Sequence, residues 1–81
     1  MVETSEAALV KLVARKNQAA FKKLLNMHLS GINRYTVRMI GNAANAEDIT
    51  QEVFLRLWTR ADSYKPEASK LSTWLHNIAH N

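Results

Sequence analysis

Turn-forming residues are scarce in this chain, because its 81 residues include only two glycines and one proline. Apolar residues recur along it with a spacing near 3.6, the period of an amphipathic helix. A chain of this length has room for a single domain, and its hydrophobic fraction of 47% is normal for a globular protein. We therefore predict an all-α fold in which short connections join helices around one small core.

The apolar spacing and the capping residues together predict a compact four-helix domain. Thr4 or Ser5 can cap the first helix, Asn17 the second and Asn45 the third. The second helix is expected to continue through Gly31, since neither a proline nor a good cap flanks that residue. The predicted elements are a short helix over 5–16, a long helix over 18–40, a helix over 46–61, a loop over 62–70 and a helix over 71–81.

Each predicted helix has one apolar face, with the charged residues largely off it. Gly41 and Asn42 give a stop signal for the long helix, and His28 is placed at its polar edge. Glu52 and Arg56 are expected to form an ion pair across one turn. The residues expected to face the core are Leu9, Leu12, Val13, Phe21, Leu24, Leu25, Ile32, Tyr35, Met39, Ile40, Ile49, Val53, Phe54, Leu57, Trp58, Ala61, Trp74, Leu75, Ile78 and Ala79.

The absence of certain residues and segments argues against several classes of function. The chain has no cysteine, which excludes disulfide frameworks, cysteine-based zinc sites and thiol catalysis. Two isolated glycines cannot form a nucleotide-binding loop, so we expect neither an enzyme nor a cofactor. No segment has the apolar length of a signal peptide or a membrane span, and the expected location is the cytoplasm.

Basic residues are concentrated in the first half of the chain. The net charge is +4, and residues 1–45 contain seven Lys or Arg against two acids. Residues 46–61 contain three acids and two arginines, with the acids toward the start, whereas residues 62–81 are balanced. A basic surface attracts polyanions such as nucleic acid, and a local acidic patch does not. Charge alone is equally compatible with ordinary solvated helix faces.

One histidine spacing resembles that of a metal site. His76 and His80 lie four residues apart, so both rings can reach one ion from a single helix face. A metalloprotease helix carries Glu directly after the first His, whereas this chain has Asn77 there. A third ligand would have to come from His28 or a carboxylate. We predict no metal and interpret the pair as polar residues on a solvent-facing or DNA-facing side.

Asp48, Gln51 and Glu52 form a polar group on the third predicted helix. Their i, i+3, i+4 spacing makes them project from one side, away from the apolar face. A glutamine between two acids can recognise a basic partner through charge and amide hydrogen bonds. An ordinary exposed helix face is the plain alternative.

Aromatic, hydroxyl, amide and basic side chains gather in the loop and at the start of the last helix. Tyr64 and Trp74 are flanked there by Lys65 and Lys70, with Ser69, Ser72, Thr73 and Asn77 nearby. This mixture provides stacking surfaces, groups that read base edges and charge for phosphate, which are what single-stranded DNA binding requires. The alternative for Trp74 is a plain core position, since it shares a stripe with Leu75 and Ile78.

Two stretches of the sequence resemble region 2 of the extracytoplasmic-function sigma factors. Residues 46–58 read AEDITQEVFLRLW, and residues 72–81 read STWLHNIAHN. The family shows the patterns AEDxxQExFLxxW and TWLxxIAxN in this order, separated by a short loop. The preceding residues 21–41 resemble the family more loosely, so the resemblance covers nearly the whole chain.

The resemblance implies two partners, RNA polymerase core and promoter DNA. Asp48, Gln51 and Glu52 would bind the coiled coil of the polymerase β′ subunit. The loop and last helix would capture a base flipped from the non-template strand of the promoter −10 element and assist strand separation. The residues implied in DNA binding are Ser63, Tyr64, Lys65, Ser69, Lys70, Ser72, Thr73, Asn77, His80 and Asn81. An anti-sigma factor is a further candidate partner, and no membrane is implied.

The sequence also departs from the family pattern. Leu71 stands where members often have an aromatic residue, and His80 stands where they often have arginine, a more constant phosphate contact. Family members continue into a second domain that reads the −35 element, so we expect residues 1–81 to be a fragment whose last helix continues. The alternative is a sigma-like interaction module that binds polymerase or an anti-sigma factor without reading DNA.

Overall fold

The computed structural model describes residues 5–80, which contain four α-helices, one 3-10 turn and no strand. The all-α four-helix prediction is thereby confirmed. The long helix has the bounds expected from the sequence and continues through Gly31. The elements are α1 (Glu6–Ala14), α2 (Gln18–Ile40), α3 (Ala43–Arg60), the 3-10 turn η1 (Ala61–Ser63) and α4 (Leu71–His80).

Side-chain caps and one glycine define where the first two helices begin and end. Ser5 caps α1 by accepting a hydrogen bond from the Ala8 amide at 3.1 Å, and Asn17 caps α2 through the Ala20 amide at 2.9 Å. Gly41 ends α2 with a left-handed φ of 74°, a conformation that costs other residues more. Thr4, the other candidate cap, lies outside the described residues.

The third helix begins earlier than the sequence indicated. Asn42, not Asn45, is its cap, and the Asn42 side chain accepts a hydrogen bond from the Asn45 amide at 3.1 Å. Ala43 and Ala44 are strong helix formers, so the helix extends back over them to the asparagine that follows Gly41. The acids of this helix therefore lie one turn further inside than expected.

Two other predicted boundaries were wrong. The first helix ends at Ala14 instead of residue 16, because Lys16 adopts a left-handed φ of 65° that breaks the helical path. The predicted loop over 62–70 is shorter, since Asp62 and Ser63 belong to η1. The last helix is described as far as His80.

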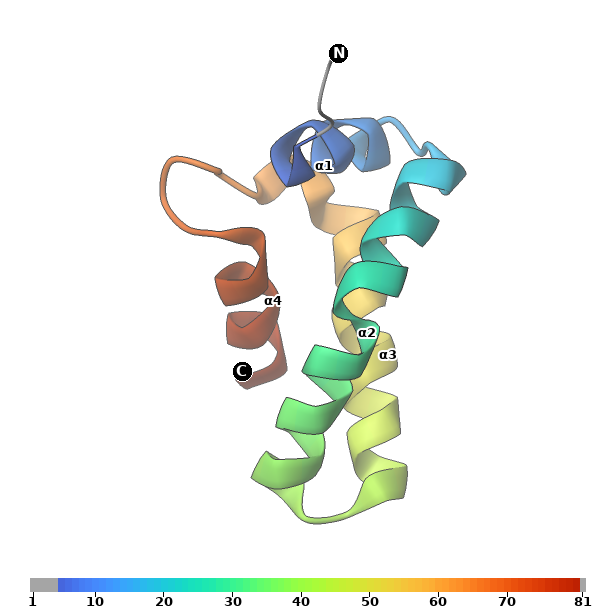
Figure 1. Cartoon of the computed structure of the whole chain (residues 1–81), viewed down its shortest axis with the longest axis vertical. Helices are drawn as coiled ribbons and strands as arrows, with labels where there is room; N and C mark the ends of the chain where they lie inside the picture. The colour runs from blue at the N-terminus through green and yellow to red at the C-terminus, as the bar shows by residue number, and fades with distance from the viewer. Residues whose placement is uncertain (1–4, 81) are drawn as a thin grey trace.

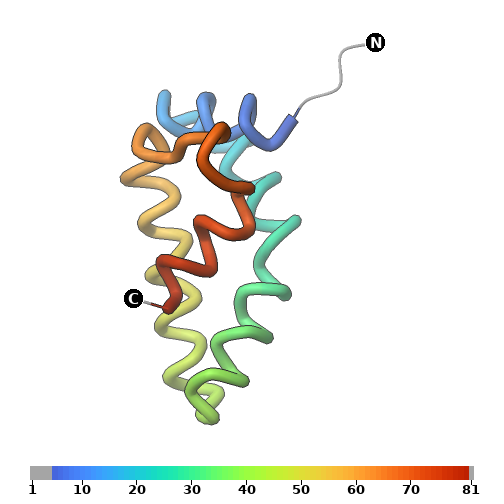
Figure 2. Tube along the Cα trace, turned by 90° about the vertical axis from the view of Figure 1, so that its left-hand side faces the viewer, coloured from blue at the N-terminus to red at the C-terminus, as the bar shows by residue number. Residues whose placement is uncertain are grey.

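Helices α2 and α3 form an antiparallel hairpin that gives the molecule its length (Figure 1). Helix α1 crosses one end of the hairpin, and α4 lies along one face of it (Figure 2). The far end of the hairpin, around Gly41, extends past α4 in both views. The opposite face of the hairpin is covered by no other described helix.

The core lies where all four helices meet. Two residues expected inside are exposed instead: Leu12 is 39% exposed and Met39 is 40% exposed. Leu12 lies about 100° around α1 from the middle of its buried stripe. Met39 lies in the last turn of α2, and that end of the hairpin extends past α4 (Figure 1). The buried apolar residues are Leu9, Val10, Val13, Ala20, Leu24, Ile32, Ala46, Val53, Phe54, Leu57, Ala61, Leu71, Leu75 and Ala79.

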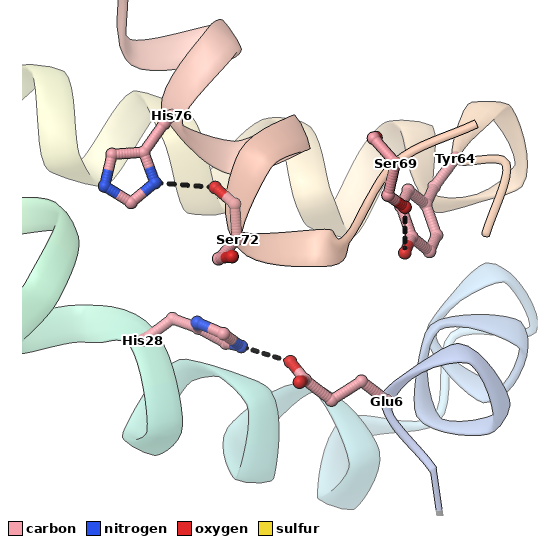
Figure 3. Close-up of polar contacts among 6 residues, drawn as sticks. All are labelled: Glu6, His28, Tyr64, Ser69, Ser72 and His76. Carbon is pink, nitrogen blue, oxygen red and sulfur yellow. Dashed lines mark hydrogen bonds and ion pairs between the residues drawn. The ribbon is translucent and has the colours of Figure 1, made fainter. Parts of the chain in front are cut away.

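Two charged side chains join α1 and the turn after it to the hairpin. Glu6, in the first turn of α1, pairs with the half-buried His28 of α2 (Figure 3). Lys16 donates to the Trp58 carbonyl at 2.7 Å and lies 5.0 Å from the centre of the Trp58 indole. That carbonyl is in the last turn of α3, which has no further helical amide to bind it, so the ammonium caps the helix end.

Candidate nucleic-acid and protein interfaces

The acidic group, Asp48, Gln51 and Glu52, lies on the middle turns of α3, and all three residues are exposed. The Glu52 carboxylate accepts a hydrogen bond from Arg56 Nε at 3.2 Å, which confirms the predicted i, i+4 pair. An exposed pair of this kind contributes little to stability. The acidic group is therefore free to bind another molecule without disturbing the core.

Buried hydroxyls fix the rotation of α3 against α2. Thr36 and Thr50 are 0% and 3% exposed, and their hydroxyl oxygens lie 3.0 Å apart across the hairpin. Each hydroxyl has one proton, so one of the two donates to the other, and the accepting hydroxyl donates to a carbonyl, either Thr36 to Asn33 at 2.9 Å or Thr50 to Ala46 at 2.8 Å. This contact sets which side of α3 faces α2, and hence which side presents the acidic group.

An apolar groove of about 970 Å³ runs between α2 and α3 on the face away from α4. Tyr35 packs against His76 of α4, whereas Asn33 and Val37, two positions away in either direction, line the groove from about 200° around the helix. No residue of α1, α4 or the loop takes part. The groove residues are Phe21, Leu25, Asn26, Leu29, Ser30, Asn33, Val37, Ala43, Glu47, Thr50, Gln51, Phe54 and Leu55.

The groove adjoins the acidic group. Gln51 belongs to both, and Glu47 lines the groove one turn earlier on α3. Leu29 and Leu55, which line it from the two helices, are 44% and 54% exposed. Exposed leucines beside carboxylates and an amide form a surface suited to a helix that carries both apolar and basic residues.

The loop over 64–70 is closed on itself by a tyrosine. The Tyr64 hydroxyl donates to the Ser69 carbonyl at 2.8 Å, so the first residue of the loop binds its last turn (Figure 3). The Tyr64 ring meets Trp74 edge to face, with ring centres 5.7 Å apart. Trp74 is half-buried, so it belongs partly to the core and partly to the loop surface.

Most of the loop is open to solvent. Lys65, Pro66, Glu67 and Lys70 are exposed, while Tyr64 and Ser69 are half-buried, and Ser63 is exposed in η1. The two lysines give the loop a basic character that Glu67 partly cancels. Burial, together with the charges of Glu6 and Glu67, raises the pKa of Tyr64, so its hydroxyl stays protonated and can donate.

Helix α4 presents a polar row beside the loop. Thr73, Asn77 and His80 are exposed, and their spacing places them within about 40° of one side of the helix. Ser72 is half-buried, and its carbonyl binds Nδ1 of His76 at 2.6 Å. Asn81 lies outside the described residues.

The histidines of α4 differ in their surroundings. A carbonyl oxygen only accepts, so His76 carries a proton on Nδ1, and its ring centre lies 4.8 Å from that of Tyr35. His80 is exposed one turn further on. Residues 5–80 bring no three metal-binding side chains together, so in this part of the chain the pair has no third ligand. No helix among the same residues is long and apolar enough to cross a membrane.

The groove was not predicted from the sequence. Leu29 and Leu55 fell outside the expected apolar stripes, and Glu47 was not singled out as a binding residue. Apolar residues left off the inward stripe of a helix were the signal that could have revealed it. The clasp between Tyr64 and Ser69 had no sequence signal, because it joins a side chain to a backbone carbonyl.

Known proteins share this chain's pattern over most of its length. The family model described as Sigma-70 region 2 matches residues 24–81. The chain is 39% identical over 72 residues to the ECF RNA polymerase sigma factor SigW of Bacillus subtilis, which covers 89% of this chain and 38% of SigW. It is 34% identical over 74 residues to the ECF RNA polymerase sigma factor SigL of Mycobacterium tuberculosis, covering 91% of this chain and 42% of SigL. The chain thus spans about two fifths of the length of these relatives, and no solved structure gives a significant match.

Proposed function

The chain belongs to the sigma-70 family as region 2 of an extracytoplasmic-function sigma factor, and from this premise we propose that it acts in transcription initiation through two separate surfaces. One surface docks on the β′ coiled coil of RNA polymerase. The other captures a flipped base of the non-template −10 strand and so favours strand separation. Binding energy, without chemistry on the DNA, drives this function.

The groove and the acidic group support docking on β′. A coiled-coil helix offers apolar residues for the groove and basic residues for Asp48 and Glu52, while Gln51 can bond to either. The exposed leucines offer apolar area whose burial on binding gives affinity. The carboxylates orient the basic partner and raise the rate of association. Within residues 5–80 the acidic group makes one ion pair, which is exposed, so docking there breaks no buried ion pair.

The loop and the polar row of α4 support base capture. Lys65 and Lys70 can bind phosphate, and Thr73 and Asn77 carry groups that bond to base edges. The half-buried rings of Tyr64 and Trp74 provide an aromatic wall. Removing a base from the stack costs a few kcal/mol, and a fitted pocket recovers this free energy only for the right base.

The separation of the two surfaces is the observation that carries this proposal. The groove is lined by α2 and α3 alone, whereas the loop joins η1 to α4 on the other face of the hairpin. A partner in the groove therefore does not cover the loop. One small domain can bind polymerase and DNA at the same time.

The test compares the affinity for a single-stranded −10 oligonucleotide with the affinity for a scrambled one, with this chain bound to core polymerase. The complex should prefer the −10 sequence, and core polymerase alone should not. Equal binding of the two oligonucleotides by the complex would refute base capture.

Docking is tested separately with the double variant Gln51→Ala and Glu52→Ala. Its affinity for core polymerase should fall by about tenfold or more, because two contacts at the interface are lost. Lys11→Ala, an exposed change on α1, is the matched control and should bind as the wild type does. Unchanged core affinity in the double variant, with both variants folded, would reject the acidic group as the docking site.

A second candidate function is a docking module that binds polymerase or an anti-sigma factor without reading DNA. The observation in its favour is Glu67, a carboxylate at the tip of the loop that repels phosphate. Shortening the loop over 64–70 separates the two candidates. A DNA reader loses its oligonucleotide preference and keeps docking, whereas a docking module has no preference to lose.

A further inference from the structure

The loop over 64–70 contains an internal frame of hydrogen bonds. The Ala68 and Ser69 amides donate to the Lys65 carbonyl at 3.0 and 3.4 Å, forming a turn around Pro66. The Tyr64 hydroxyl closes this turn from outside by binding the Ser69 carbonyl at 2.8 Å. Apart from this clasp, the middle of the loop is exposed and has few packing contacts to fix its shape.

The clasp is attached to the rest of the fold at Tyr64. Its ring packs on Trp74 of α4, and the Tyr64 amide donates to the Ala61 carbonyl of η1 at 3.2 Å. Helix α1 packs against η1, and after burial the charge of Glu6 on that helix also contributes to the raised pKa of Tyr64. One side chain thus connects the loop to α4 through its ring and closes the loop through its hydroxyl.

We propose that Tyr64 is a positioning residue, whose hydroxyl holds the loop in the shape that accepts an unstacked nucleobase before DNA arrives. This inference rests on the base capture proposed above and adds how the loop achieves selectivity. A loop ordered in advance loses less conformational freedom on binding, so more of the contact energy appears as affinity for the fitted base. A loop without the clasp adapts to different bases and discriminates less among them.

The variant Tyr64→Phe removes the hydroxyl and leaves a ring that can pack on Trp74. Tyr35→Phe is the matched control, since it makes the same chemical change at a tyrosine on α2 that packs against His76. Replacing Lys70 by its α-hydroxy acid perturbs the same clasp independently, because an ester makes the Ser69 carbonyl a weaker acceptor. This second change keeps Tyr64 intact, and the Lys70 nitrogen donates to no backbone carbonyl among residues 5–80.

The probe is a single-stranded oligonucleotide that the wild-type chain, bound to core polymerase, selects from a randomised pool. Each position is then changed in turn to the other bases. In Tyr64→Phe, the ratio of the affinities for the selected base and for another base should fall about fivefold at one position of the oligonucleotide. This is the effect of one lost hydrogen bond, and core docking should be unchanged. The Ala68 amide should exchange with solvent faster by a similar factor, and the ester variant should show both effects.

The outcomes separate this inference from the proposed function. If the wild type selects a base and both clasp variants select it equally well, the positioning role is overturned while base capture stands. An equal loss of affinity at every position, for matched and mismatched bases alike, would also overturn it, because that marks general destabilisation. If the wild type selects no base at any position, base capture fails and the inference fails with it.

Discussion

The hydroxyl pair between α2 and α3 gives the sharpest test of how the hairpin is assembled. The perturbation is a cycle of three variants, Thr36→Val, Thr50→Val and the double change, compared with the wild type. Valine keeps the shape of threonine and replaces the hydroxyl by a methyl group. Each single variant removes the 3.0 Å contact between the two hydroxyls.

The remaining hydrogen bonds determine the expected size of the effect. After Thr50→Val, Thr36 can still donate to the Asn33 carbonyl at 2.9 Å, and after Thr36→Val, Thr50 can still donate to the Ala46 carbonyl at 2.8 Å. The two protons make one bond across the hairpin and one bond to a carbonyl, and each single change removes the bond across the hairpin at a cost of about 1 kcal/mol. The double change replaces both partners by apolar groups of the same shape, which adds little further cost. The coupling energy is therefore about 1 kcal/mol, and separate effects of each added methyl cancel in the cycle.

Urea unfolding followed by circular dichroism at 222 nm measures all four free energies. The double variant should be about 1 kcal/mol more stable than the sum of the single effects predicts, equivalent to roughly 4–8 °C in Tm for a domain of this size. Additive single effects, within about 0.3 kcal/mol, would show that the two hydroxyls do not act together. The account of how α3 is oriented would then be wrong.

Three further predictions follow from the glycines and from the charge of the loop. Gly31→Ala should raise stability by about 1 kcal/mol, since an added Cβ meets nothing within 4 Å, whereas Gly41→Ala should lower it by about 1–2 kcal/mol because of the φ of 74°. A fall in Tm for Gly31→Ala, or a rise in Tm for Gly41→Ala, would contradict this. Glu67→Gln should tighten single-stranded DNA binding about twofold to fivefold at low salt by removing a like charge, and weaker binding would reject the repulsion. Lys65→Ala with Lys70→Ala should reduce the slope of log K against log salt by about 1.4 if both lysines bind phosphate, and an unchanged slope would remove them from the interface.

The course of the helices was largely predictable from the sequence, because periodicity and caps are local signals. The long helix through Gly31 was correct, since nothing nearby stops it. The start of α3 was wrong because two asparagines, Asn42 and Asn45, both suit a cap, and the sequence alone does not decide between them. Met39 was placed inside because a periodic pattern does not reveal where the covering helix ends. Leu12 was placed inside because it fits a stripe with Leu9 and Val13, whereas the buried stripe is centred toward Val10.

The candidate site was predictable only in part. The motifs singled out the acidic group and the loop, and the structure leaves both accessible. The groove was missed because a hairpin has two faces, and the sequence does not say which one α4 covers. The Tyr64 clasp depends on the loop path after Pro66, which no local rule fixes.

The attachment of α1 has a consequence for how the domain responds to its medium. Each end of this segment is held to the hairpin through one charged side chain, Glu6 at the start and Lys16 after the end, while three buried side chains secure its middle. Ions in solution weaken the two end ties and leave apolar packing intact. Rising ionic strength should therefore loosen helix α1 before it affects the hairpin. Because α1 packs against η1, the contact between these two elements should be more sensitive to salt than the packing of α2 on α3.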